Sequence, residues 1–125
     1  MSLDTNCKDA GYLCGRLFAV LERIQEQASD SELNRTIKDS YLSSASSSPA
    51  SVLPNLLNLA NNHMEKIKSK NKGYYVKLDK LICEIMDKFG AEYPSTLTAN
   101  EQGAFHIGYY HQRQAFFNSK KENNE

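Results

Sequence analysis

The chain has 125 residues, and its 15 Lys and Arg side chains balance 15 Asp and Glu side chains, so the formal net charge is zero. This length fits one domain with a sizeable core, predicted over residues 1–125. The chain has no apolar run near the 18 residues of a membrane helix and no recognisable signal peptide. Zero net charge also excludes a uniformly basic nucleic-acid coat.

Three cysteines, Cys7, Cys14 and Cys83, are present. An odd number without a signal peptide predicts a reducing, cytoplasmic setting. Cys7 and Cys14 would lie about 10 Å apart on one helix, which is too far for a disulfide. We therefore expect the cysteines to be buried and to act as small core residues.

Apolar residues recur at spacings of three and four through the first segment, which predicts an amphipathic helix over residues 6–28, capped by Thr5 or Asn6. Gly11 and Gly15 lie four apart on it. Because each lowers helix propensity, we expect them to allow the close approach of a neighbouring helix. The polar residues predicted to point outward are Arg16, Glu22, Arg23, Glu26 and Gln27.

A shorter helix is predicted over residues 31–43. Six of the nine residues from 43 to 51 are serine, which indicates a tight polar connection. A third helix is expected to begin near Pro49 or Pro54, because proline is tolerated in a first helical turn. Gly73 is expected to end it.

The fourth predicted helix covers residues 75–89 and is closed by Gly90. Residues 98–101 have the form of a capping box, a hydroxyl followed three residues later by a carboxylate. They precede a last helix over residues 99–118, and the polar tail from Ser119 is expected to fray. The sequence therefore predicts an all-α fold, a compact bundle of about five helices with short loops.

The common catalytic motifs are absent, and this favours a protein that is not an enzyme. The three histidines are His63, His106 and His111. The last two are five apart, which does not place them on one helical face, and no carboxylate is spaced to complete a metal site, so none is expected. Glu84 and Asp87 are more typical of a solvated helix face than of a catalytic pair. No catalytic residue, metal or cofactor is predicted.

The charges are unevenly distributed along the chain. Residues 66–80 hold six lysines against Asp79 alone, a net charge of +5, while the other 110 residues hold nine basic and fourteen acidic groups, a net charge of −5. Such lysines suit contact with nucleic-acid phosphates, which is independent of base sequence. The alternative is a lysine-rich loop that only keeps the bundle soluble.

Residues 108–114 read GYYHQRQ and combine aromatic, amide and arginine side chains. Single-strand binders often place aromatic platforms beside cations. Alternatively, Tyr109 and Phe116 belong to the core and Tyr110 to its rim. Arg113 is as well suited to a structural salt bridge as to a phosphate contact.

Four segments together resemble the C-terminal region of the type I-C CRISPR large subunit, which is also produced separately, by internal translation, as the small subunit of the type I-C Cascade complex. These segments are residues 17–22, 44–59, 80–86 and 108–114, and GYYHQRQ is the most specific of them. The resemblance covers residues 7–118.

This resemblance implies an all-helical subunit that is not an enzyme. It implies as partners the crRNA-bound backbone subunits, the large subunit, neighbouring copies of the chain and target DNA, with no membrane. The subunit would contact the guide–target hybrid and the displaced strand during R-loop formation, while base pairing supplies the specificity. The alternative is a purely structural adaptor that assembles proteins without touching nucleic acid.

No family motif assigns the contacts, so the candidate residues rest on charge alone. Arg16 and Arg23, seven apart on one helix face, are possible further contacts to nucleic acid or to neighbouring subunits. The acidic remainder would suit docking against basic subunits. The nucleic-acid-binding candidates are Lys66, Lys68, Lys70, Lys72, Lys77, Arg35, Lys38 and Arg113.

Overall fold

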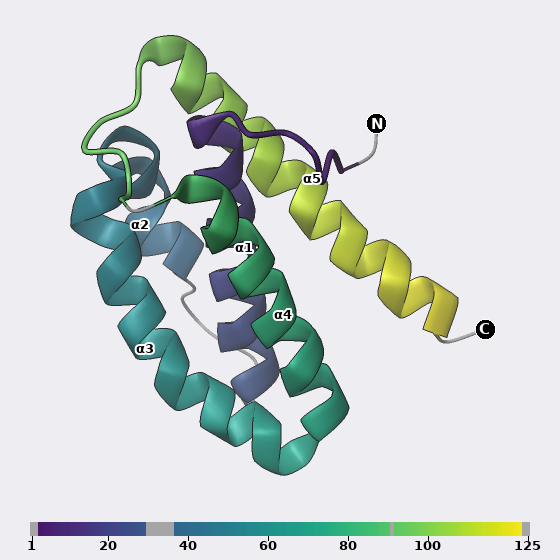
Figure 1. The fold of residues 1–125 in the computed structure, drawn as a ribbon. Coiled ribbons are helices and arrows are strands. Elements are labelled where there is room, and N and C mark those ends of the chain that lie inside the picture. The colour runs from purple at the N-terminus through teal and green to yellow at the C-terminus, as the bar shows by residue number, and fades with distance from the viewer. Residues whose placement is uncertain (1–2, 30–36, 91, 124–125) are drawn as a thin grey trace.

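A computed structural model describes residues 3–29, 37–90 and 92–123. These residues form five α-helices and, within the described ranges, no strand, which confirms the predicted all-α fold (Figure 1). None of these helices is both long and apolar enough to cross a membrane. The helices are α1 (Ala10–Ala28), α2 (Ile37–Ser47), α3 (Pro49–Lys70), α4 (Lys72–Phe89) and α5 (Ala99–Asn123).

The central element is α1, which contacts each of the other four helices. Every residue from Gly11 to Glu22 is buried, so this stretch of the helix is covered on all sides. The predicted helix is present, but the expectation that Arg16 and Glu22 point outward was wrong. The reason is α5, which covers a polar face of α1 and supplies hydrogen-bonding partners for it.

The close packing of α1 against α5 depends on glycine. A Cβ atom at Gly11 or Gly15 would overlap the backbone carbonyl oxygen of Glu101 or Phe105, and one at Gly108 would overlap that of Tyr12. The prediction that the first two glycines admit a neighbouring helix is thus confirmed. The backbones approach until side chains no longer fit between them, and Phe18 packs on Phe105 and Tyr109 beside this contact.

The start of α1 lies later than predicted. Asp9 is the N-cap, and its carboxylate accepts a hydrogen bond of 3.1 Å from the backbone N–H of Tyr12. Asp9 therefore caps the helix in place of Thr5 or Asn6, and its carboxylate also complements the positive end of the helix dipole. Residues 3–9 form no helix.

The serine-rich stretch is mostly helical, and this corrects the predicted connection over residues 43–51. The side chains of Ser46 and Ser47 donate hydrogen bonds to the backbone carbonyl of Ser43, one turn earlier in α2, so the serines satisfy their hydroxyls within a helix. Only Ser48 separates α2 from α3, which begins at Pro49. Residues 30–36 lie outside the described ranges, so the predicted start at residue 31 is not described.

A single residue, Asn71, both ends α3 and begins α4. Its backbone N–H donates to the carbonyl of Ile67, and its side chain accepts from the backbone N–H of Tyr74. The prediction that Gly73 ends the third helix was wrong, because the asparagine closes both helix ends two residues earlier and Gly73 lies within α4.

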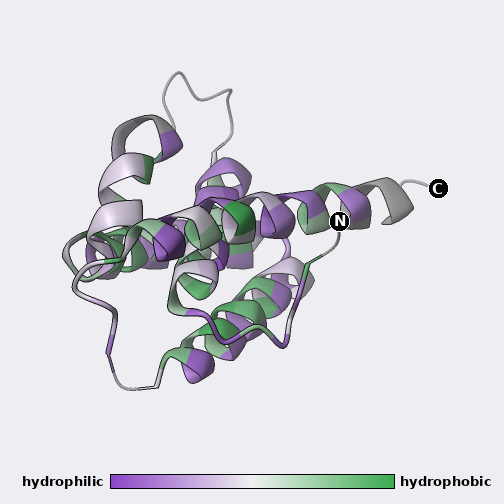
Figure 2. Cartoon of the chain, turned by 90° about the horizontal axis from the view of Figure 1, so that it is seen from above, coloured by the Kyte–Doolittle hydropathy of each residue, from purple (hydrophilic) through white to green (hydrophobic). Residues whose placement is uncertain are grey.

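The remaining boundaries follow the sequence more closely. Gly90 has a φ of 76° and ends α4 as predicted. Thr98 and Glu101 exchange hydrogen bonds of 2.9 and 3.2 Å, which confirms the capping box at the start of α5. The last helix continues to Asn123, beyond the predicted end, and its C-terminal part extends past the rest of the bundle (Figures 1 and 2).

The core lies where α1 meets the other helices, and apolar helix faces turn inward in the view from above (Figure 2). Of the three cysteines, only Cys14 is buried as predicted. Burial, followed by the charges of Glu101 and Asp9, raises the pKa of Cys14 to about 12, so this thiol stays protonated. Cys7 is half-buried and Cys83 is exposed, which corrects the expectation for those two.

Candidate nucleic-acid interface

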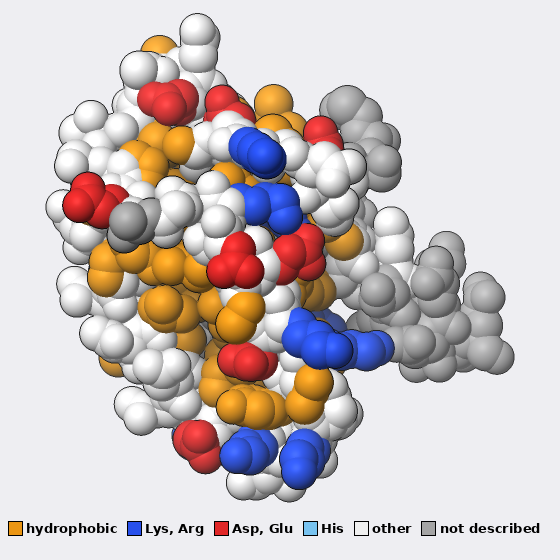
Figure 3. Space-filling model, in the orientation of Figure 1, with side chains coloured by type: hydrophobic (Ala, Val, Ile, Leu, Met, Phe, Trp, Pro, Cys, Tyr) orange, Lys and Arg blue, Asp and Glu red, His pale blue; other side chains and the backbone are white. Residues whose placement is uncertain are grey.

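The lysine-rich window forms one end of the molecule, where α3 turns into α4. Lys66, Lys68 and Lys70 occupy the last turns of α3, and Lys72 is the first residue of α4. We call these four residues the hairpin tip. All of them are exposed, and Figure 3 shows Lys and Arg side chains at this end of the molecule. Lys77 is also exposed, further along α4.

Helix electrostatics explains only part of this cluster. Lys68 and Lys70 lie in the last turn of α3, where a cation is stabilised by the negative end of the helix dipole. The Lys68 ammonium also lies over the Tyr75 ring, 5.4 Å from its centroid. Lys72 lies at the opposite, positive end of α4, where a cation is unfavourable. The position of Lys72 therefore has no stabilising role in α4.

Several of these lysines are also without acidic partners. Among the residues that the structure describes, no carboxylate lies within ion-pair distance of Lys66, Lys72 or Lys77. Lys66 also contributes, after burial, to lowering the pKa of the half-buried His63 on the same helix. At Lys66 and Lys72 the hairpin tip thus carries positive charges that no carboxylate of the described residues neutralises.

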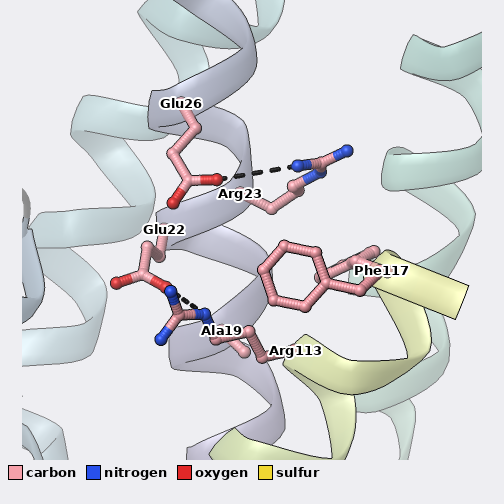
Figure 4. A pocket seen from close by; sticks show the side chains of 7 residues that line it. Ala19, Glu22, Arg23, Glu26, Arg113 and Phe117 are labelled. Atoms are coloured by element: carbon pink, nitrogen blue, oxygen red, sulfur yellow. Dashed lines mark ion pairs between the residues drawn. The ribbon is translucent and has the colours of Figure 1, made fainter. Parts of the chain in front are cut away.

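Two other candidates, Lys38 and Arg113, meet at a different place, around Glu22 of α1. Arg113 Nε lies 3.9 Å from the Glu22 carboxylate, and its guanidinium stacks 5.5 Å from the Phe117 ring (Figure 4). The Lys38 ammonium lies 5.8 Å from the centroid of the Tyr109 ring. The salt-bridge interpretation of Arg113 is therefore correct, although its side chain remains 39% exposed.

This second group encloses a buried acid. The Tyr109 hydroxyl donates a hydrogen bond of 2.8 Å to Glu22, which is 4% exposed. Burial raises the pKa of Glu22, although Tyr109 and Arg113 oppose the shift. Burial and the contact with Glu22 also raise the pKa of Tyr109. Tyr109 is a core residue, as the second interpretation of the aromatic segment predicted, whereas Tyr110 is 59% exposed.

The two arginines offered as further contacts have structural surroundings. Arg16 is fully buried, so it cannot contact nucleic acid in this conformation. Its Nε donates a hydrogen bond of 3.0 Å to the Gln112 side chain. Arg23 Nε donates a hydrogen bond of 2.9 Å to the Tyr74 hydroxyl, and its guanidinium lies over the Phe116 ring. The proposed surface contact by Arg16 is wrong, because α5 covers it.

The structure therefore brings the hairpin-tip lysines together and places Lys38 with Arg113 in a separate group. Arg35 lies outside the described residues. The hydrogen bond from Arg16 to Gln112 was not predicted from the sequence. The signal for it would have been a polar residue, Gln112, on the predicted core face of the last helix.

Within the described ranges, no three His, Cys, Asp or Glu side chains lie close enough to hold a metal ion. His111 Nδ1 lies 2.9 Å from the Tyr12 hydroxyl. Glu84 forms an ion pair of 3.8 Å with Lys88, as expected for a carboxylate on a helix surface, and a second of 3.9 Å with the buried Arg16.

Comparison with known proteins gives one family. The model of a family described as CRISPR-associated protein (Cas_Csd1) matches residues 1–117. A search of curated proteins finds no match to the chain. The matched range includes the first four helices, the hairpin tip and α5 as far as Phe117, so both groups of basic residues lie within it.

Proposed function

Because the chain belongs to the Cas_Csd1 family of CRISPR-associated proteins, we propose that it is a non-catalytic small subunit of a type I-C Cascade surveillance complex. In this role it contacts nucleic-acid backbone and stabilises the R-loop, formed by the guide–target hybrid and the displaced strand. Its partners are the crRNA-bound backbone subunits and the large subunit. The family membership and the resemblance of residues 108–114 to the large subunit's C-terminal region support this assignment.

The observation that carries the nucleic-acid role is the hairpin tip. Asn71 joins two helix ends so closely that lysines from both project at one end of the molecule. The position of Lys72 does not stabilise its helix, and neither Lys66 nor Lys72 has a carboxylate partner among the described residues. A site of this kind binds phosphates in any sequence, which suits a complex whose guide RNA reads the target.

The R-loop exchanges one duplex for another of similar stability, so modest backbone contacts are enough to shift the balance. Lys38 and Arg113 form the second candidate surface. Because Arg113 is already paired with Glu22, this second surface is a weaker candidate than the hairpin tip.

The test compares two variants with the same loss of charge in the assembled complex. Lys66→Gln/Lys72→Gln removes two tip cations, and the control Lys8→Gln/Lys88→Gln removes two cations that lie away from the tip and are not candidate contacts. The dependence of log K on log salt for R-loop formation should become less steep by about 1.4 to 1.8 in the tip variant, from 0.7 to 0.9 per phosphate contact.

The control variant should keep the wild-type slope. Equal losses in the two variants would mean that net charge, rather than the tip, is responsible. If R-loop yield and lifetime are unchanged when the subunit is omitted, the chain is an adaptor. In that case, changes on acidic or apolar helix faces would block assembly and neutralising the tip would not.

A further inference from the structure

A cavity of about 370 Å³ opens where the start of α1 meets the end of α4, and the segment that connects α4 to α5 forms its third side. We call it the α1–α4 cavity. Sites for small organic ligands in proteins have volumes of this order. The cavity is remote from the hairpin tip, because 16 positions of α4, about 24 Å, separate Lys72 from Lys88. It is therefore not part of the candidate nucleic-acid interface.

The wall that the connecting segment gives to the α1–α4 cavity is fixed in place. The backbone N–H of Ala50 donates a hydrogen bond of 3.0 Å to the carbonyl of Pro94, which lines the cavity. The backbone N–H of Leu97 donates one of 3.2 Å to the carbonyl of Ser47. Both bonds tie the segment to the junction between α2 and α3. The cavity is therefore formed before any ligand enters, as is usual for small-molecule sites.

The floor of the α1–α4 cavity is apolar and partly aromatic. Leu13 is buried there, and the half-buried rings of Phe89 and Tyr93 lie 5.5 Å apart between their centroids. The Tyr93 hydroxyl donates to the sulfur of Met86 at 3.6 Å, so this ring is held at both its face and its edge. Such a floor suits a flat aromatic ligand that stacks on a ring.

Polar side chains of both signs border this floor. Lys8, Glu92 and Ser95 line the cavity and are exposed. Among the residues that the structure describes, no side-chain hydrogen bond or ion pair engages any of the three. Lys88 also lines the cavity, and its contact with Glu84, at 3.8 Å, is longer than a hydrogen bond. Two ammonium groups, a carboxylate and a hydroxyl are thus available to a ligand.

We propose that the α1–α4 cavity binds a free nucleoside monophosphate. The phosphate would lie between Lys8 and Lys88, the base would stack on the Tyr93 ring, and Glu92 would accept hydrogen bonds from the base. Two ammonium groups suit a phosphate dianion. Every base has a flat face that stacks on an aromatic side chain. Guanine offers the carboxylate adjacent donors, its ring N–H and its amino group, so guanosine monophosphate (GMP) is the probe of choice.

The first test compares GMP with its two parts by isothermal titration calorimetry on the full chain. GMP should bind at one site and about tenfold or more tightly than either guanosine or inorganic phosphate, because only GMP uses both the lysines and the aromatic floor. If inorganic phosphate binds as tightly as GMP, the lysines alone are responsible and the nucleotide assignment is wrong. A chain that shows no binding at millimolar GMP would overturn the site itself.

Variants then assign the two ends of the ligand. Lys8→Gln/Lys88→Gln should weaken GMP binding by about tenfold or more and leave guanosine binding unchanged. Tyr93→Leu should weaken the binding of both, and circular dichroism must show that it keeps its helical content. The control Lys77→Gln/Lys80→Gln removes two exposed cations of α4 outside the cavity and should bind GMP like wild type. Equal losses in the two lysine variants would contradict the proposed phosphate position.

A last comparison separates this site from the hairpin tip. The tip variant Lys66→Gln/Lys72→Gln should bind GMP like wild type, whereas Lys8→Gln/Lys88→Gln should lose GMP binding and keep the wild-type salt dependence of R-loop formation. A failure of one assay therefore leaves the other conclusion intact. A short single-stranded oligonucleotide should not displace GMP. If it does so more effectively than GMP itself, the cavity holds a base of a nucleic-acid strand, and the assignment to a free nucleotide is overturned.

Discussion

Replacing Gly108 by alanine tests whether α1 and α5 really pack backbone to backbone. An ideal Cβ at this position would overlap the carbonyl oxygen of Tyr12 and lie 3.0 Å from its carbonyl carbon. Both atoms belong to the backbone of a buried helix, so neither can rotate away as a side chain could. The two helices would have to separate, and this would disturb the aromatic packing of Phe18 against Tyr109.

The size of the effect follows from two opposing contributions. Overpacking a well-packed core costs about 1–3 kcal/mol and sometimes more. Alanine regains about 1 kcal/mol of helix propensity relative to glycine. Because the clash is with backbone, we expect a net loss of about 2 kcal/mol, which for a domain of this size lowers the melting temperature by about 8 °C.

The matched control lies on the same helix. Gly103 is exposed and has nothing within 4 Å of its Cβ position, so Gly103→Ala should gain about 0.5–1 kcal/mol from helix propensity alone. Thermal and urea unfolding followed at 222 nm measure both variants. If Gly108→Ala proves as stable as Gly103→Ala, the close helix contact is incorrect.

Two further predictions concern buried polar groups. Gln112→Leu removes the hydrogen-bond acceptor of the buried Arg16 and should lower the free energy of unfolding by about 2–3 kcal/mol. Adding Arg16→Met should recover most of this loss, and a double variant less stable than the single one in urea would contradict the reasoning. Burial raises the pKa of Glu22, so the folded state binds a proton on this carboxyl more tightly than the unfolded state does. The free energy of unfolding therefore falls as pH rises from the ordinary glutamate pKa through the raised pKa of the folded state. Glu22→Gln should therefore unfold at higher urea than wild type at pH 7 and at a similar concentration below the ordinary pKa, whereas a difference independent of pH would show that Glu22 is not responsible.

Much of the helical architecture could be predicted from the sequence because apolar periodicity and capping residues are local signals. The capping box of Thr98 and Glu101 and the closing role of Gly90 are examples. Gly11 and Gly15 also indicated close helix contact correctly, since glycines four apart on a helix have few other uses there.

The errors arose where a distant residue decides the outcome. Arg16 and Glu22 look solvent-facing by periodicity, but both are buried with hydrogen-bonding partners on α5, about 90 residues later in the chain. The α3–α4 boundary was misplaced because Asn71 has two capping roles at once, and glycine is the stronger signal in a sequence. The candidate lysines of the tip were identified from charge alone. That they lie together at one end of the molecule depends on the turn between α3 and α4, which the sequence did not place correctly.

The pairing of α1 with α5 also determines when this chain can fold. Hydrogen bonds between these helices join residues 87 to 99 positions apart, whereas the α3–α4 hairpin closes locally. Closing so long a loop carries a large entropic cost and slows folding relative to local contacts. A nascent chain still lacking α5 would hold α1 with its glycine face uncovered and without the hydrogen bonds that join Arg16 to Gln112 and Glu22 to Tyr109. We therefore expect the central helix to be completed last, when the end of the chain has left the ribosome.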